Sequence, residues 1–217
     1  MLCKPGGYYH QTQFVSNSEL TSLRNIMRAD GKPPPLAAYR LGSLVDAQLT
    51  EAGMLSKAQY EEGEWDLSER MALAGRGDST LAAFLATAKM QHEVYRNRFE
   101  MEHEGIDFSL PMRCKYDLYK RTARLAADIK TTSCTSQAAF VASILSFEYH
   151  RQGALYMDLG NADQFMFIGI GKKPKLGKHP IFKFVIRRGD AYYEAGRARY
   201  LQLANLYYFL IFQIHTL

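Results

Sequence analysis

The sequence predicts a mixed α/β fold, with a central mixed β-sheet flanked by helices and preceded by an N-terminal helical segment. Three observations support this prediction. Apolar residues recur at helical spacing in residues 1–96, the pattern becomes strand-like near Asn97, and strands and helices then alternate to the end of the chain. The 217 residues, 47% hydrophobic and 23% charged, suit one domain, with a mainly helical part (1–96) and an α/β core (97–217).

The first part is expected to contain three helices. Asn17 or Ser18 would cap a helix that ends near Met27, and the Gly-Lys-Pro-Pro-Pro run at 31–35 would break it. Residues 37–50 form the second predicted helix. Residues 79–96 are predicted as the third, capped by Asp78 or Ser79, and the acidic stretch 61–69 is interpreted as a solvated surface.

The second part alternates in type. The predicted elements are strands at 99–103 and 112–119 joined by a turn with Gly105, a central strand at 125–131, a helix at 136–147 capped by Ser136, strands at 165–170 and 181–186, and a helix at 190–214. Within the last helix, residues 203–214 are too short to span a bilayer and are interpreted as buried.

Charge and cysteine content indicate the surroundings in which the protein works. Residues 1–110 carry 11 basic and 15 acidic side chains, whereas residues 111–217 carry 16 basic and 7 acidic ones, which suggests an anionic partner for the second half. The residues after Met1 lack the apolar run of a signal peptide. Three scattered cysteines, Cys3, Cys114 and Cys134, form no disulfide framework. We expect a cytoplasmic protein that does not associate with a membrane.

Two carboxylates and an ammonium are predicted to converge on the central sheet. Asp128 and Lys130 share one face of a strand because side chains alternate, and Asp117 suits the neighbouring strand of a hairpin. Such oxygen ligands favour Mg²⁺ or Mn²⁺, and a lysine beside the metal can orient or deprotonate an attacking water. The alternative is a surface salt bridge, but charges within the apolar run LAADIKT call for a partner or a metal.

Gln152 and Tyr156 are the next candidates. They lie four residues apart, on one face of a predicted helix, and could contact a phosphate or a base. The alternative is a tyrosine packed in the core beside an exposed glutamine.

These residues together resemble a known superfamily. Asp117, the strand ADIKTT at 127–132 and the helix YHRQGALY at 149–156 resemble the PD-(D/E)XK nucleases, and most closely their RecE-like (exodeoxyribonuclease VIII-like) exonuclease branch. That branch has a D-[LI]-K-T-T strand followed by a Y-H-x-Q-x-x-x-Y helix. Residues 17–20 and 39–46 resemble its opening segments, so the likeness covers about 15–160.

The resemblance implies a restriction-endonuclease-like core and assigns roles by position. Asp117 and Asp128 would bind the metal, Lys130 would be the catalytic lysine, and Gln152 and Tyr156 would border the DNA. Glu100 would add a metal ligand, less closely matched. Asp46 stands where the branch places a metal-binding histidine and could still bind Mg²⁺; alternatively it is a carboxylate on a helix surface. Tyr116 stands where the superfamily name has proline. A related branch carries a four-cysteine iron–sulfur cluster, which three cysteines cannot supply.

A basic segment follows the proposed catalytic residues. It could track a phosphate backbone without reading sequence, or it could be a solvated loop. Its residues are Lys172, Lys173, Lys175, Lys178, Lys183, Arg187 and Arg188.

The leading functional hypothesis is a metal-dependent DNA exonuclease that hydrolyses phosphodiester bonds. The resemblance implies action on the ends of double-stranded DNA in recombination or phage DNA processing, a ring-like homo-oligomer and a single-strand annealing protein as partner. Two alternatives are a DNA-binding module of the same fold that has lost catalysis, marked by Asp46, and an endonuclease of restriction or repair type.

Overall fold

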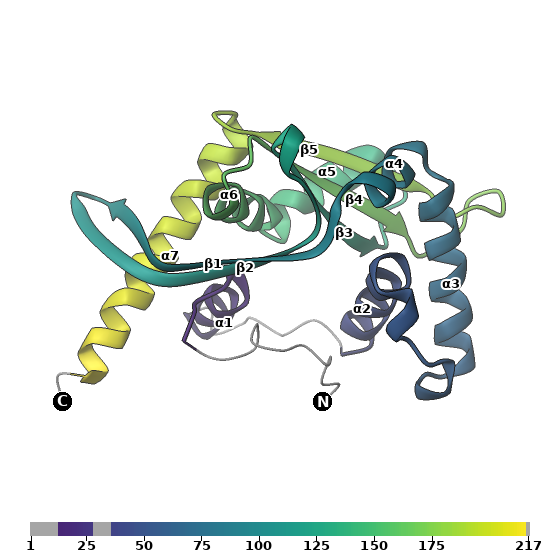
Figure 1. Cartoon of the computed structure of the whole chain (residues 1–217), viewed down its shortest axis with the longest axis horizontal. Helices are drawn as coiled ribbons and strands as arrows, with labels where there is room; N and C mark the ends of the chain where they lie inside the picture. Colours follow the sequence, from purple (N-terminus) through teal and green to yellow (C-terminus); the bar gives the residue numbers. More distant parts are fainter. Residues whose placement is uncertain (1–12, 28–35, 216–217) are drawn as a thin grey trace.

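The computed structural model describes residues 13–27 and 36–215, which form seven α-helices and one five-stranded sheet (Figure 1). The helices are α1 (Asn17–Met27), α2 (Leu36–Thr50), α3 (Glu62–Gly77), α4 (Ser79–Thr87), α5 (Gln137–Ser146), α6 (Tyr149–Gly160) and α7 (Ala191–His215). The strands are β1 (Lys89–His103), β2 (Ile106–Lys120), β3 (Leu125–Thr132), β4 (Gln164–Gly171) and β5 (Ile181–Arg187). Short 3₁₀ turns include η4 (Arg121–Ala123), between β2 and β3.

The sheet has the order β1-β2-β3-β4-β5, with β3 at its centre, as the sequence predicted. Only β3 and β4 pair in parallel, and the crossover between them contains α5 and α6; the other neighbours are antiparallel. This mixed sheet with flanking helices and N-terminal helices confirms the predicted fold class.

Each face of the sheet has its own hydrophobic core. One core joins β2, β4 and β5 to α5, α6 and α7, and includes Tyr116, Phe165 and Phe167. The other joins β3 and β4 to α2, α3 and α4, and includes Val45 and Ile129. Because β3 is covered on both faces, a charged side chain on it lies between packed layers, where it needs a partner.

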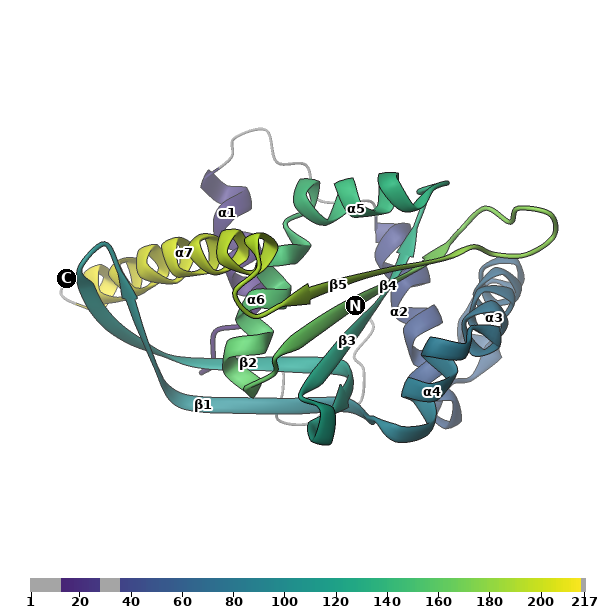
Figure 2. The ribbon, with the colours of Figure 1, turned by 90° about the horizontal axis from the view of Figure 1, so that it is seen from above.

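The β1–β2 hairpin is longer than the rest of the sheet. β2 pairs with β3 only from Leu118 to Lys120, so most of the hairpin extends away as an arm beside α7, on the side of the molecule opposite α2, α3 and α4 (Figures 1 and 2). The turn at Glu104 and Gly105 closes it, and both residues have positive φ values, of 51° and 78°. The turn that contains Gly105 is therefore where the sequence placed it.

The predicted helix at 79–96 is wrong beyond Thr87. Asp78 does cap α4, because its Oδ1 accepts hydrogen bonds from the N–H groups of Thr80 and Leu81. The chain then becomes extended at Ala88, and residues 92–96 pair with β2 instead. Pairing with residues 16 to 24 positions further along the chain overrides the local helical pattern, which a periodicity argument cannot foresee.

One sequence prediction is corrected at the first turn of α1. Ser16, and not Asn17 or Ser18, caps α1: its Oγ accepts from the N–H of Ser18, while Glu19 accepts from the Ser16 N–H, which is a capping box. The acidic stretch at 61–69 lies mostly in α3, where Glu61, Glu62 and Glu69 are exposed, as expected of a solvated surface, and the partly buried Glu64 forms an ion pair with Arg40 of α2. The predicted break at 31–35 and Cys3 lie outside the described residues.

A cluster of charged side chains fastens α1 and α7 to α6. Glu148 precedes α6 in a left-handed conformation (φ 56°), and its carboxylate lies 3.0 Å from Arg24 and 3.3 Å from both Arg151 and Arg199. Arg151 also donates to the Thr21 hydroxyl of α1. We call these residues the arginine cluster. It joins three helices around one nearly buried carboxylate.

The last helix is buried only in its first part. Tyr200, Leu203 and Ala204 are buried, whereas Phe209 and Leu210 are exposed, so the prediction that residues 203–214 are buried is wrong for these two side chains. Among the described residues, no helix is long and apolar enough to cross a membrane.

Candidate functional site

Asp117 and Asp128 lie side by side where β2 and β3 begin to separate. The last paired residues there are Leu118 and Ala127, so the two aspartates occupy the next pair of positions. The Asp117 carboxylate accepts a hydrogen bond of 2.7 Å from the N–H of Ile129. Asp117 thereby continues the contact between the two strands, and its carboxylate is fixed against β3.

Asp128 is held from two sides. Its Oδ1 accepts a hydrogen bond of 2.6 Å from the amide of Gln152 on α6, and its Oδ2 lies 2.6 Å from the ammonium of Lys130. Lys130 in turn lies over the ring of Tyr149, at 5.1 Å from its centroid. The alternation that placed Asp128 and Lys130 on one face is therefore seen in the structure, and that face is the one covered by α6.

Asp46 brings a third carboxylate from α2. Its side chain is buried and accepts hydrogen bonds of 3.1 and 3.2 Å from the amide of Gln91, while the Thr50 hydroxyl contacts it at 3.3 Å. Burial, followed by the charges of Asp46 and Asp128, raises the pKa of Asp117 well above its usual value.

We call Asp46, Asp117, Asp128 and Lys130 the carboxylate cluster. Burial alone would lower the pKa of Lys130, but the charges of Asp128 and Asp117 outweigh it and raise that pKa. Three carboxylates and one ammonium leave surplus negative charge among packed side chains. A cation is the natural complement of such a site, and oxygen donors suit hard divalent ions such as Mg²⁺ and Mn²⁺.

The carboxylates in their present positions do not form a complete coordination shell. Across residues 13–27 and 36–215, no group of three His, Cys, Asp or Glu side chains is arranged to hold a metal ion. Each carboxylate already has a protein partner: Ile129 for Asp117, Gln152 and Lys130 for Asp128, and Gln91 for Asp46. Electrostatic repulsion between the three carboxylates acts over longer distances than a metal–ligand bond. The carboxylates can therefore raise the pKa of Asp117 without lying close enough to share an ion. The chemical nature and charge of the donors therefore fit a divalent ion, while a coordinated ion would have to displace some of these contacts.

Glu100 is not near this cluster, so its assignment as a metal ligand is wrong. It pairs with Ser109 on the hairpin arm, eight residues along β2 from Asp117, or roughly 26 Å at the usual strand rise. Its side chain is 74% exposed and forms an ion pair with Arg98. Glu100 was matched to the family's acidic residue by its order along the chain. That match failed because β1 is longer than the sequence suggested, which places Glu100 far along the hairpin.

Gln152 and Tyr156 have different environments although they share a face of α6. Gln152 positions Asp128, whereas the Tyr156 ring packs in the core against Tyr116 and Phe165, with centroids at 5.5 and 5.8 Å. The core alternative is therefore the better description of Tyr156. Gln91 and Tyr149 were missed. Tyr149 begins the quoted YHRQ motif and could have been found, whereas Gln91 lay within the mistaken helix.

The basic segment divides into exposed lysines and structural cations. Lys173, Lys175 and Lys178 are exposed on the β4–β5 loop, which projects at the side of α3 in Figure 2. Lys172 is half-buried, and its N–H bonds to the carbonyl of Thr132.

Two other members of that segment serve the fold. Lys183 bonds to Asp78 and Thr80 at the start of α4. Arg188 forms an ion pair with Asp158 and donates to the carbonyls of Met157 and Ala162, so its prediction as a phosphate contact is replaced by a structural role. Arg187 is exposed.

Comparison with known proteins gives similarity in fold at low sequence identity. No protein-family model and no curated protein sequence matches the chain. Among solved structures, a phage-related exonuclease from Haemophilus somnus 129PT is 17% identical, with a TM-score of 0.42 over 90% of this chain and 95% of that one. An alkaline exonuclease from Laribacter hongkongensis is 14% identical, with a TM-score of 0.39 over 94% of each chain. A third structure, SSO0001, is 15% identical, with a TM-score of 0.39 over 86% and 81%.

Proposed function

We propose that this chain is a metal-dependent deoxyribonuclease that hydrolyses phosphodiester bonds. The observation that carries the proposal is the contact of Lys130 with Asp128 at 2.6 Å, next to the carboxylates of Asp117 and Asp46. A lysine held against a group of carboxylates at the central strand suits Mg²⁺-assisted phosphate hydrolysis, because the carboxylates can hold the ion and the lysine can orient the attacking water.

The roles follow from the contacts. Asp117 and Asp128 would hold a Mg²⁺ or Mn²⁺ ion, with Asp46 as a further ligand, and the ion would stabilise negative charge on the phosphate. Gln152 fixes the Asp128 carboxylate. Lys130 offers an ammonium that can donate hydrogen bonds to the attacking water or to the phosphate. Tyr149 restricts where that ammonium can lie.

We further propose that the substrate is the end of duplex DNA, that the protein forms a ring-like oligomer, and that it works with a single-strand annealing partner. These three points are supported by the sequence resemblance to RecE-like exonucleases. The same resemblance supports a single nuclease domain over residues 1–217, in which 97–217 form the catalytic core. The β1 strand, which begins at Lys89, would then belong to that core.

One observation favours a second function, that of a DNA-binding module without catalysis. Every carboxylate of the cluster is already bonded within the protein, as it would be if no metal were ever bound. An endonuclease of restriction or repair type would use the same chemistry at internal bonds.

One digestion experiment separates these functions. Linear and closed circular duplex DNA are incubated with the protein, with Mg²⁺ or with EDTA. Mg²⁺-dependent loss of the linear duplex alone supports the exonuclease, and cleavage of the circle supports the endonuclease. Binding without cleavage of either substrate would support the DNA-binding module without catalysis.

A further inference from the structure

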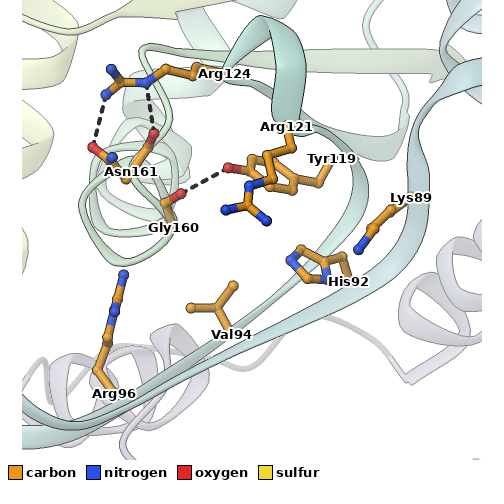
Figure 3. Close-up of a pocket in the computed structure, with 9 residues that line it drawn as sticks. All are labelled: Lys89, His92, Val94, Arg96, Tyr119, Arg121, Arg124, Gly160 and Asn161. Carbon is orange, nitrogen blue, oxygen red and sulfur yellow. Dashed lines mark hydrogen bonds between the residues drawn. The ribbon is translucent and has the colours of Figure 1, made fainter.

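A basic pocket lies between the start of the β1–β2 hairpin and the end of α6, outside the carboxylate cluster (Figure 3). Its volume is about 430 Å³. Lys89, His92 and Arg96 come from β1, Tyr119 from the end of β2, and Arg121 and Arg124 from the turn that follows. Four of its lining side chains are permanently cationic and none is acidic, so the pocket suits an anion.

Part of this positive charge has a structural explanation. Arg96 donates to the carbonyl of Leu159, and Arg124 donates to the carbonyl and side chain of Asn161 and pairs with Asp163. Both arginines therefore satisfy groups at the end of α6. In Figure 3, Arg124 turns towards Asn161.

Lys89 and Arg121 are not accounted for in this way. Both side chains are exposed, and within the described ranges neither has a carboxylate at ion-pair distance. In Figure 3 the guanidinium of Arg121 lies above Val94 and His92, and Lys89 lies on the far side of His92 from Val94. They are two cations that the fold does not need for its own hydrogen bonds.

The pKa of His92 is affected by the charges of both Lys89 and Arg121, so the two cations act on the same part of the pocket. Its ring stacks on Tyr119, with centroids 5.2 Å apart and an interplanar angle of 10°. Burial, followed by the positive charges of Lys89 and Arg121, lowers the pKa of His92, and Glu93 opposes this effect. The flat wall of His92 and Tyr119 and the two cations thus border one volume.

The pocket lies close enough to the carboxylate cluster to contact the same ligand. Tyr119 is two residues after Asp117, and Gly160 is two turns of α6 beyond Gln152, or about 12 Å along the helix axis. Successive phosphates of one strand are about 3.4 Å apart along a duplex axis and further apart through space, so a separation of this size spans a few nucleotides. A strand held at the cluster would therefore present another phosphate at the pocket a few nucleotides away.

We propose that Lys89 and Arg121 form a binding site for a backbone phosphate of the DNA strand, a few nucleotides from the bond that is cut. The assignment of DNA rests on the proposed function. This site would set the position of the strand and carry no sequence preference. This site is separate from the exposed lysines of the β4–β5 loop. The pocket borders the start of β3, whereas the loop begins beside the other end of that strand, where Lys172 bonds to Thr132.

The test compares two double variants that lose the same charge. Lys89→Ala/Arg121→Ala removes the pocket cations, and Lys57→Ala/Arg98→Ala removes an exposed lysine and arginine elsewhere. Binding of a short fluorescein-labelled duplex is measured by anisotropy over a range of salt concentrations, with Ca²⁺ in place of Mg²⁺ to prevent cleavage. The duplex is used with and without a 5′-phosphate.

The pocket variant should bind both duplexes roughly tenfold more weakly, and the slope of log affinity against log salt should shrink by about 1, as expected for the loss of one phosphate contact. The control variant should match the wild type.

Three results would overturn the inference: equal losses in both variants, an unchanged salt slope in the pocket variant, or a loss confined to the 5′-phosphorylated duplex, which would mean a terminal-phosphate site. Failure of the proposed function looks different. The wild type would then bind DNA without cutting it, and the comparison of the two variants would still decide whether the pocket holds a phosphate.

Discussion

Two clusters of charged side chains meet the first turn of α6, and they are built with opposite signs. The carboxylate cluster gathers three aspartates around one lysine, whereas the arginine cluster gathers three arginines around Glu148. Consecutive residues of α6 serve the two: Arg151 belongs to the second, and Gln152 holds Asp128 of the first. About 100° of helix rotation between neighbouring residues sends the two side chains to different sides of α6.

The two clusters differ in what their partners join. The arginine cluster connects α1, α6 and α7, and Arg151 is only 2% exposed, so its charges hold packed helices together. The carboxylate cluster joins β2, β3 and α2, and its surplus charge is negative. The exposure of the two clusters is similar, with Lys130 at 23% and Asp128 at 7% against Arg199 at 29% and Glu148 at 10%. The sign of the surplus therefore separates them, because a negative surplus can be neutralised by a bound metal ion, whereas the arginine cluster fastens helices. Mutations should separate these two roles.

The largest effect is expected at Lys130. Lys130→Ala should lower Mg²⁺-dependent cleavage by about 10³-fold, which corresponds to about 4 kcal/mol of transition-state stabilisation, with folding and DNA binding nearly intact. Single-turnover cleavage of a labelled linear duplex measures the loss, and circular dichroism checks the fold. A variant that cuts DNA at the wild-type rate would remove Lys130 from the mechanism.

The arginine cluster should respond in stability instead. Glu148→Gln leaves three guanidinium groups without their counter-charge and should lower the free energy of unfolding by about 3 kcal/mol. Urea denaturation measures this change, with Glu194→Gln on the exposed start of α7 as the control. If both variants unfold at the same urea concentration, the cluster does not hold the helices together.

The pH dependence of that difference provides a check. Burial alone would raise the pKa of Glu148, but the neighbouring arginines outweigh it and hold that pKa below its ordinary value of 4.5. A carboxylate with a lowered pKa contributes stability above its ordinary pKa and loses that contribution as the pH falls through the folded-state value. The gap between wild type and Glu148→Gln should therefore be constant at neutral pH and narrow below about pH 4.5.

Asp46 tests whether the third carboxylate belongs to the metal site. Asp46→Ala should weaken Mg²⁺ binding about tenfold, because one anionic oxygen donor is lost. Asp46→His should keep some activity but favour softer, imidazole-binding ions over Mg²⁺. Calorimetric titration with Mg²⁺, Mn²⁺ and Zn²⁺ measures both effects. A structure with a metal on Asp117 and Asp128 and the Asp46 carboxylate outside coordination distance would contradict the prediction.

A smaller effect of the opposite sign is expected at Asp117. Asp117→Asn removes one of three repelling carboxylates and should raise the free energy of unfolding in EDTA by about 1 kcal/mol. Added Mg²⁺ should raise the melting temperature of the wild type and leave that of the variant nearly unchanged. A variant that is less stable than wild type in EDTA would show that the Ile129 hydrogen bond outweighs the repulsion.

The exposed lysines of the β4–β5 loop should have the smallest effect. Replacing Lys172, Lys173 and Lys175 with Ala should leave stability unchanged within about 0.5 kcal/mol. It should weaken duplex binding about threefold for all sequences alike and reduce its salt dependence. Anisotropy with two unrelated duplexes measures this. Unchanged affinity and salt slope would place the path of the DNA elsewhere.

The sequence was most informative where the structure depends on short-range patterns. Alternation predicted that Asp128 and Lys130 share a face, the apolar run predicted that their strand is central, and the cap residues Asp78 and Ser136 began their helices as expected. These features depend on neighbours within a few residues, which the chain displays directly.

What the sequence did not reveal depends on contacts between distant residues. Residues 92–96 follow a helical pattern but pair with β2, and this error displaced Glu100 and concealed Gln91. The basic pocket combines β1 with the end of α6, and the arginine cluster combines three helices. The run of lysines near residue 175 was conspicuous in the sequence, whereas these assembled sites had no local signature.

The position of β1 at the edge of the sheet has a consequence for self-association. Its outer side offers fifteen residues of backbone that pair with no other strand of the described sheet. Such an edge is a template for strands of other molecules, which is the route to aggregation. Six charged residues are spread along this strand, and its register shifts between Arg96 and Phe99. Charge and irregularity both oppose the stacking of flat strands, so the arm carries its own protection against fibril formation.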